Sequence, residues 1–145
     1  MTVVAKAIAQ LVEHFVSTVY ADSNVEGMRS AQWAALRYFD EVEPSARTVG
    51  NFARQNLITD SSASQTISSL VRRDLLGKIP SKKDGRSHQL HLTESARTLL
   101  ARDPLNLLVN AVDDLSAKQK TELADVLQKI YLSMQSTQSS SDDKG

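Results

Sequence analysis

The stretch that decides the fold runs from Asp60 to Ala96, DSSASQTISSLVRRDLLGKIPSKKDGRSHQLHLTESA. It predicts a helix over 61–76, two strands at 78–82 and 87–93, and a further helix that Thr93 caps. The strands are joined by a tip that contains Asp84-Gly85, and this pair favours a hairpin because both residue types tolerate positive φ. The stretch therefore predicts the order helix, hairpin, helix.

The predicted helix over 61–76 separates apolar from polar side chains. At 100° per residue, one sector holds Ala63, Ile67, Leu70 and Val71, and another holds Ser62, Gln65, Thr66, Ser69 and Arg73. The polar sector contains no carboxylate, a group that phosphate would repel. A serine-rich face is commonly only a solvated surface. Beside a basic hairpin, however, it is typical of a winged helix-turn-helix, in which the helix enters one DNA groove and the hairpin reaches the next.

Charge is distributed unevenly along a chain of 145 residues whose net charge is zero. Between 72 and 86 there are six basic residues, Arg72, Arg73, Lys78, Lys82, Lys83 and Arg86, against two acidic ones, Asp74 and Asp84. The segments 1–44 and 103–145 both contain more acidic than basic residues. The central segment is therefore the surface that we expect an anionic partner to contact.

The remaining segments predict further helices, so the fold class is mainly α (α+β). Apolar spacing of three and four residues predicts helices over 3–21, 31–42 and 48–56, with Ser30 as the cap of the second. Either Thr59 or Asp60 is suited to cap the helix that follows. Pro104 predicts a break near 102–103, and Ser116 is expected to cap the last helix.

These elements predict one domain over residues 1–135. It comprises a winged helix DNA-binding lobe at about 30–95 and terminal helices at 1–22 and 96–135. Because the terminal helices carry continuous aliphatic stripes, we expect them to form a dimerisation region. The segment 136–145, STQSSSDDKG, lacks apolar side chains and is expected to be disordered.

The order of elements resembles the MarR family of bacterial transcription regulators. The similarity rests on AQWAALRY at 31–38, SQTI at 64–67, DGR at 84–86 and LTE at 92–94, and it covers nearly the whole chain. The chain departs from the family where a glycine is usual, at Asp74 and Ala96, and at Asn56, where leucine is more usual. Asp74 lies where the recognition helix ends, and we expect its replacement of the usual glycine to alter the angle of the wing.

The resemblance implies a homodimer that binds palindromic double-stranded DNA, with one recognition helix in the major groove of each half-site. It also implies that Arg86, oriented by Asp84, reaches the adjacent minor groove. Residue chemistry agrees for the helix, because Gln65 is suited to paired hydrogen bonds with adenine and Thr66 to contact with thymine. The predicted DNA-binding residues are Ser61, Ser62, Gln65, Thr66, Ser69, Arg72, Arg73, Lys82, Lys83, Asp84 and Arg86.

The predicted function is a sequence-specific transcription regulator, a repressor modulated by a small and possibly aromatic effector. The residues suggested for the effector cleft are His14, Phe15, Met28, Trp33, Arg37 and Tyr38. For most of them an ordinary place in the core is an equal alternative, and Arg37 is also suited to pair with Asp40 or Glu41. The rival function is a winged-helix module for protein–protein interaction that does not bind DNA.

Several other classes are not expected. The chain has no cysteine, which excludes disulfides and thiolate metal sites and fits a cytoplasmic protein. His88 and His91 point to opposite faces of a strand, so they make a poor metal chelate. We expect no metal, no cofactor and no enzyme activity, since no catalytic or nucleotide-binding motif is present. The amphipathic first helix predicts neither a signal peptide nor a membrane span.

Overall fold

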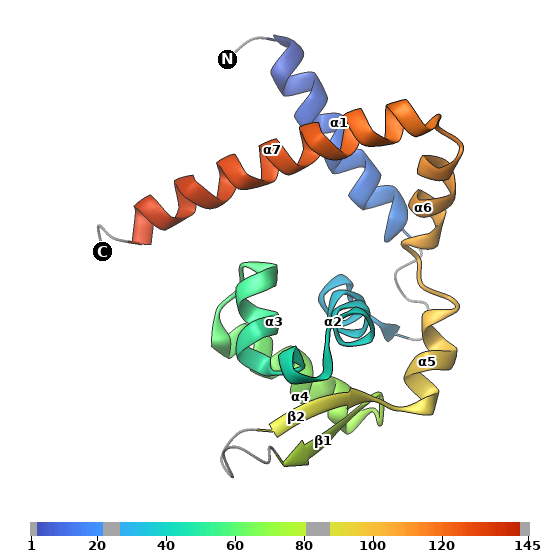
Figure 1. Cartoon of the computed structure of the whole chain (residues 1–145), viewed down its shortest axis with the longest axis vertical. Coiled ribbons are helices and arrows are strands. Elements are labelled where there is room, and N and C mark those ends of the chain that lie inside the picture. Colours follow the sequence, from blue (N-terminus) through green and yellow to red (C-terminus); the bar gives the residue numbers. More distant parts are fainter. Residues whose placement is uncertain (1–2, 22–26, 81–87, 143–145) are drawn as a thin grey trace. The chain divides into compact units, whose positions relative to one another are not determined.

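The computed structural model describes residues 3–21, 27–80 and 88–142, and the chain divides into two compact units between Leu105 and Asn106. The first unit contains a small antiparallel sheet and five α-helices within the described ranges (Figure 1). Its elements are α1 (Val3–Val19), α2 (Ser30–Glu41), the 3-10 turn η2 (Pro44–Ala46), α3 (Val49–Asn56), α4 (Asp60–Arg72), β1 (Leu76–Pro80), β2 (His88–Leu92) and α5 (Glu94–Leu100). The second unit contains α6 (Asn106–Asp113) and α7 (Ala117–Asp142).

Three threonines fix the starts of α3, α4 and α5. The hydroxyls of Thr48, Thr59 and Thr93 each accept a hydrogen bond from a backbone N–H in the first turn of the helix that follows. Thr59, rather than Asp60, is therefore the cap of α4. The start of α2 differs from the prediction, because Ser30 is its first helical residue and Arg29 occupies the cap position.

The turn after α4 explains why this helix ends at Arg72 rather than at the predicted residue 76. Asp74 adopts a left-handed conformation with φ of 58°, and the N–H of Leu75 then bonds back to the Leu70 carbonyl at 2.9 Å. This closure stops the helix and turns the chain into β1. Asp74 thus takes the conformation that a glycine would adopt there, and the Thr93 hydroxyl holds its carbonyl at 2.7 Å.

The hairpin begins two residues earlier than predicted, at Leu76 instead of Lys78. Leu76 pairs with Leu92, and Pro80 pairs with His88 at the other end of the ladder. The shift follows from burial: Leu76, Leu90 and Leu92 all lie in the core, so the strand must start where Leu76 can face inward. The tip, with the predicted contacts Lys82, Lys83, Asp84 and Arg86, lies outside the described residues.

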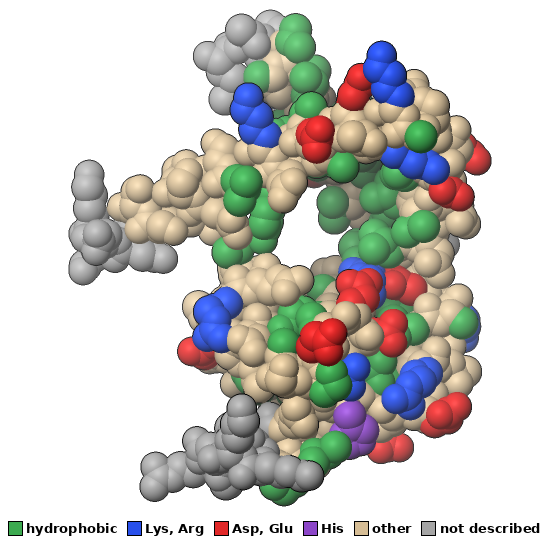
Figure 2. Space-filling model, viewed as in Figure 1, with side chains coloured by type: hydrophobic (Ala, Val, Ile, Leu, Met, Phe, Trp, Pro, Cys, Tyr) green, Lys and Arg blue, Asp and Glu red, His purple; other side chains and the backbone are tan. Residues whose placement is uncertain are grey.

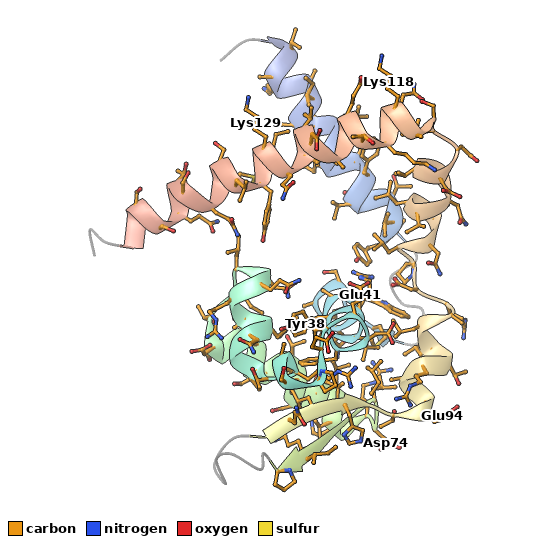
Figure 3. The ribbon with its side chains drawn as sticks, viewed as in Figure 1. Tyr38, Glu41, Asp74, Glu94, Lys118 and Lys129 are labelled. Atoms are coloured by element: carbon orange, nitrogen blue, oxygen red, sulfur yellow. The ribbon has the colours of Figure 1, made fainter. Side chains whose placement is uncertain are left out.

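The core of the first unit lies between α2, α3, α4 and the hairpin. Aromatic rings form its centre, with Phe39 5.1 Å from Tyr38 and 5.8 Å from Phe52 between ring centroids. Trp33 and Leu36 of α2 and Ile67 and Leu70 of α4 complete the packing and are essentially inaccessible to solvent. Figure 3 shows Tyr38 inside this lobe, whereas Asp74 and Glu94 lie at its surface. This core fixes which side of α4 faces out.

Helix α1 carries an exposed apolar stripe. Its exposed large side chains are Val4, Ile8, Leu11, Val12, Phe15 and Val16. Helix α7 of the second unit carries another, formed by Leu123, Val126, Leu127, Ile130, Tyr131 and Met134. Figure 2 shows hydrophobic side chains in the surface of both helices. Across 3–21, 27–80 and 88–142, no helix is both long and apolar enough to cross a membrane.

The predicted disordered tail is corrected over 136–142, where α7 continues as a helix to Asp142. The hydroxyls of Ser136, Thr137 and Ser139 donate to backbone carbonyls three or four residues earlier, which provides local partners for these polar side chains within the helix. The break predicted near Pro104 is confirmed, because α5 ends at Leu100 and α6 begins at Asn106. The predicted Ser116 cap is also confirmed, with its hydroxyl 3.2 Å from the Gln119 nitrogen.

Candidate nucleic-acid interface

The exposed face of α4 is formed mainly by small polar side chains. Ser61, Ser64, Gln65, Ser68 and Arg72 line a shallow groove of about 540 Å³ along this helix. Their spacing of three, four and seven residues places them on one side, opposite the buried Ala63, Ile67 and Leu70. Hydroxyl, amide and guanidinium groups offer hydrogen bonds to base edges and phosphates, which suits this face to the major groove.

This face lies to one side of the predicted polar sector. Ser61, Gln65 and Arg72 were predicted, whereas Ser64 and Ser68 were missed. The prediction grouped the polar residues by their angular positions around the helix axis, without reference to the most buried side. A better signal was the direction opposite the most buried apolar residues, because burial of Ala63, Ile67 and Leu70 sets the rotation of the helix.

The other side of the predicted sector faces α2. The Ser69 hydroxyl accepts a hydrogen bond from the Gln32 side chain at 2.9 Å and donates to the Thr66 carbonyl at 2.6 Å. Arg73 donates to the Gly27 carbonyl at 3.3 Å and contacts the Met28 sulfur at 3.1 Å. Ser69 therefore forms a contact between α2 and α4, and its DNA contact stays a prediction.

The helix-turn-helix is built by α3, a tight turn and α4. Leu57 ends α3 with φ of 54°, and the Ile58 N–H bonds to the Ala53 carbonyl at 3.1 Å. Thr59 then opens α4, so only three residues separate the two helices. The start of α4 exposes Ser61 and Ser62, whose position at a helix N-terminus suits them to phosphate contact.

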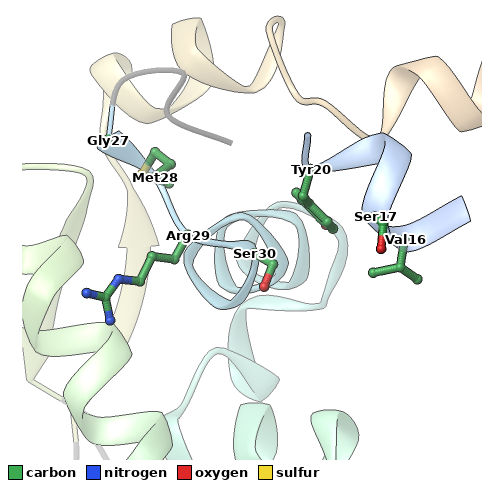
Figure 4. Close-up of a pocket in the computed structure, with 7 residues that line it drawn as sticks. All are labelled: Val16, Ser17, Tyr20, Gly27, Met28, Arg29 and Ser30. Atoms are coloured by element: carbon green, nitrogen blue, oxygen red, sulfur yellow. The ribbon is translucent and has the colours of Figure 1, made fainter. Parts of the chain in front are cut away.

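Residues predicted for the effector cleft do not line one cavity. Trp33 and Tyr38 belong to the core, and the exposed His14 and Phe15 lie on α1. A groove of about 700 Å³ does lie between the end of α1 and the start of α2, and Met28 is its only predicted lining residue. Figure 4 shows the residues that line it, including Tyr20 and Ser30. Trp33 and Tyr38 lie in the core because burial of their rings stabilises the lobe.

Arg37 is held by a network that the sequence did not predict. Its guanidinium contacts the Asp103 carboxylate at 2.7 Å and the Tyr20 hydroxyl at 2.9 Å, rather than Asp40 or Glu41. Burial alone lowers the pKa of Arg37, but the bonds to Asp103 and Tyr20 outweigh it, so the net pKa is raised. Asp103 also accepts from the Leu105 N–H at 2.9 Å. The network ties α1, α2 and the segment after α5 together.

The pairing of the two strands places His91 opposite Gly77. His91 packs against Gly77, whose missing Cβ would lie 2.2 Å from the imidazole Cε1. In the described part of the chain, no group of three His, Asp or Glu side chains is arranged to hold a metal ion. His91 is thus accounted for by packing on the hairpin.

Together these elements define the class of a winged helix-turn-helix protein. Residues 26–87 match the model of the MarR family, which spans the lobe from just before α2 to the hairpin tip. Over these residues the match confirms the resemblance to the MarR family that the sequence predicted. No curated protein matches the chain.

Solved structures share the fold over most of the chain. MarR of Staphylococcus aureus in complex with salicylate and kanamycin is 20% identical, with a TM-score of 0.71, covering 90% of this chain and 89% of that one. The MepR–DNA complex from S. aureus is 17% identical, with a TM-score of 0.70 and coverages of 90% and 97%. The PcaV transcriptional regulator from Streptomyces coelicolor with its natural ligand is 19% identical, with a TM-score of 0.67 and coverages of 86% and 89%. These similarities confirm the mainly helical winged-helix fold.

Proposed function

We propose that this chain is a homodimeric, sequence-specific DNA-binding transcription repressor whose DNA affinity is modulated by a small-molecule effector. The observation that carries the proposal is the exposed face of α4, where Ser61, Ser64, Gln65, Ser68 and Arg72 line one groove. This face offers donors and acceptors without a carboxylate, which is the chemistry that a base edge and its flanking phosphates require. The protein is expected to act by binding and not as an enzyme.

Dimerisation is supported by the exposed apolar stripes of α1 and α7. A stripe of this size on a single helix costs free energy in water, and a second copy of the chain would bury it. A dimer also places two recognition helices about one DNA turn apart, which suits a palindromic site. Light scattering should therefore give twice the mass of the chain. A monomeric mass at micromolar concentration would contradict this part of the proposal.

The DNA proposal is tested by selecting bound fragments from the source genome and measuring their affinity against salt. Each neutralised phosphate contributes about −0.9 to the slope of log affinity against log salt, so binding should weaken steeply between 50 and 200 mM salt. A salt-independent affinity, or no bound fragment, would instead favour the protein–protein interaction module.

Two substitutions separate base contact from wing contact. Gln65→Ala should relax preference at one position per half-site, at a cost of roughly 1–3 kcal/mol. Arg86→Ala should weaken binding and leave the preference at that position unchanged, because the wing is proposed to contact the minor groove. Lys82, Lys83, Asp84 and Arg86 remain predicted contacts.

An effector is supported by the ligand complexes of two structurally similar proteins, S. aureus MarR with salicylate and PcaV with its natural ligand. In this chain the groove beside Met28 and Tyr20 offers a polar and aromatic lining for a small molecule. Such a ligand would release DNA only through its higher affinity for the form that does not bind DNA. Competition of salicylate against the selected DNA provides a first test.

A further inference from the structure

A second groove, of about 470 Å³, lies between the start of α2 and α4 and is strongly basic. Arg29 enters it from α2, and Arg72 and Arg73 enter it from α4. The described residues that line this groove include no acidic side chain. Three like charges in one groove repel each other, and an anion bound between them would remove that repulsion.

Arg29 has no evident role in stabilising its own helix. It occupies the cap position of α2, but its side chain makes no capping bond, and instead the Gln32 side chain accepts from its backbone N–H at 2.8 Å. A cation at this end of a helix also opposes the helix dipole. A serine or threonine side chain at this position would accept a hydrogen bond from the first turn and so stabilise the start of α2. The arginine therefore suits a contact outside the helix.

The geometry of the groove favours a bound ligand rather than an internal ion pair. Arg73 is held in place by the Gly27 carbonyl at 3.3 Å and the Met28 sulfur at 3.1 Å, so part of the basic lining is fixed in advance. Figure 4 shows the Arg29 side chain extending from the start of α2 toward α4 and away from Tyr20. Arg29 and Arg72 are both exposed, which leaves them accessible to a partner.

We propose that this groove binds a backbone phosphate of the DNA duplex, with Arg29 as the contact supplied by α2. The occupant is assigned to DNA because Gln65 and Arg72 line both this groove and the groove along the exposed face of α4. A duplex whose bases meet Gln65 therefore presents its flanking phosphates to Arg29. The proposal rests on the DNA-binding function and adds α2 to the interface.

The test compares Arg29→Gln with Arg29→Lys and with Arg97→Gln in the full-length chain, using a duplex selected from the source genome. Arg97 is the matched control because it is an exposed arginine on α5 that lines neither groove. Arg29→Gln should reduce the salt slope by about 1 for each bound protomer, and Arg29→Lys and Arg97→Gln should retain it. For one contact, the fold-increase in the dissociation constant between 50 and 200 mM salt should be about 3.5 times smaller in Arg29→Gln than in the wild type.

A scan of single methylphosphonate substitutions in the duplex then locates the phosphate. Each substitution removes one backbone charge. At one position in each half-site, it should weaken duplex binding by the wild type and leave duplex binding by Arg29→Gln unchanged. Circular dichroism checks that the variants are folded. A slope for Arg29→Gln equal to that of the wild type, or an equal loss in Arg97→Gln, would overturn the inference while leaving DNA binding intact.

Two further outcomes also count against the groove as a DNA contact. Tight binding of inorganic phosphate alone, abolished by Arg29→Gln, would assign it to a free anion. If the wild type binds no duplex, the proposed function fails together with this inference. If the wild type binds DNA with a salt-dependent affinity and Arg29→Gln has the same salt slope, the Arg29 contact fails and the proposed function stands.

Discussion

Replacement of Asp103 tests whether the network around Arg37 stabilises the first unit. Asp103 is only 8% exposed, and its carboxylate accepts from the Arg37 guanidinium at 2.7 Å and from the Leu105 N–H at 2.9 Å. Asp103→Ala removes both hydrogen bonds and leaves the Arg37 charge with only the Tyr20 hydroxyl from the network. The fold should therefore lose stability, without loss of any proposed DNA contact.

The magnitude follows from the two lost bonds. A hydrogen bond to a charged group contributes about 1.5–3 kcal/mol and a neutral one about 0.5–1.5 kcal/mol. Breaking a fully buried ion pair costs about 3–5 kcal/mol, but Arg37 keeps 18% exposure and gains some hydration. We expect a loss of about 2–4 kcal/mol for Asp103→Ala. Asp103→Asn should lose less, about 1–2 kcal/mol, because the amide oxygen still accepts one bond.

The assay is urea unfolding followed by circular dichroism at a fixed protein concentration, so that any dimerisation contributes equally to each variant. The matched control is Asp113→Ala. Asp113 forms an ion pair of almost the same length, 2.8 Å to Lys120, but it is 79% exposed. Water solvates both Asp113 and Lys120, so loss of this ion pair should produce only a small change in the urea midpoint.

The double substitution Arg37→Met with Asp103→Leu separates charge burial from packing. If the loss in Asp103→Ala comes from an unpaired buried charge, the apolar pair should recover most of the stability. Equal losses for Asp103→Ala and Asp113→Ala would refute the reasoning, because burial is the main difference between the two pairs.

Three other substitutions test the hairpin, the helix exit and the core. Gly77→Ala should destabilise the hairpin by about 1–3 kcal/mol because its Cβ would lie 2.2 Å from the His91 ring, and adding His91→Ala should restore most of that loss in thermal unfolding. Asp74→Ala should lower the free energy of unfolding by more than about 0.4–1 kcal/mol, because alanine tolerates the φ of 58° poorly. An Asp74→Gly variant that is destabilised by a similar amount would contradict this account. Burial raises the pKa of Tyr38 from 10.0, an effect that the charge of Arg54 partly opposes, so the unfolded phenol ionises first and stability should fall as pH rises above 10. Tyr38→Phe should flatten this alkaline decline in urea midpoints, and an unchanged pH profile would count against it.

The sequence alone was sufficient for the order of elements and for the fold class. Apolar spacing, threonine caps and the Asp-Gly pair are local signals, and each acts within a few residues of the chain. They correctly indicated the helices, the hairpin and the break near Pro104. The boundaries were less exact, since β1 begins at Leu76 because of inward packing that no local signal reports.

Which side of α4 faces outward was decided only by tertiary packing. Polar residues occupy more than half of this helix, so polarity alone allowed the sector of Ser69 and Arg73 as well as that of Ser64 and Ser68. Burial of Ile67 against the core rotated the first sector toward α2. The same packing places Arg29 and Arg73 in one groove, although they are 44 positions apart in the sequence. It also places the Asp103 carboxylate beside the Arg37 guanidinium. Such pairings depend on long-range contacts, and a single sequence carries no local signal for them.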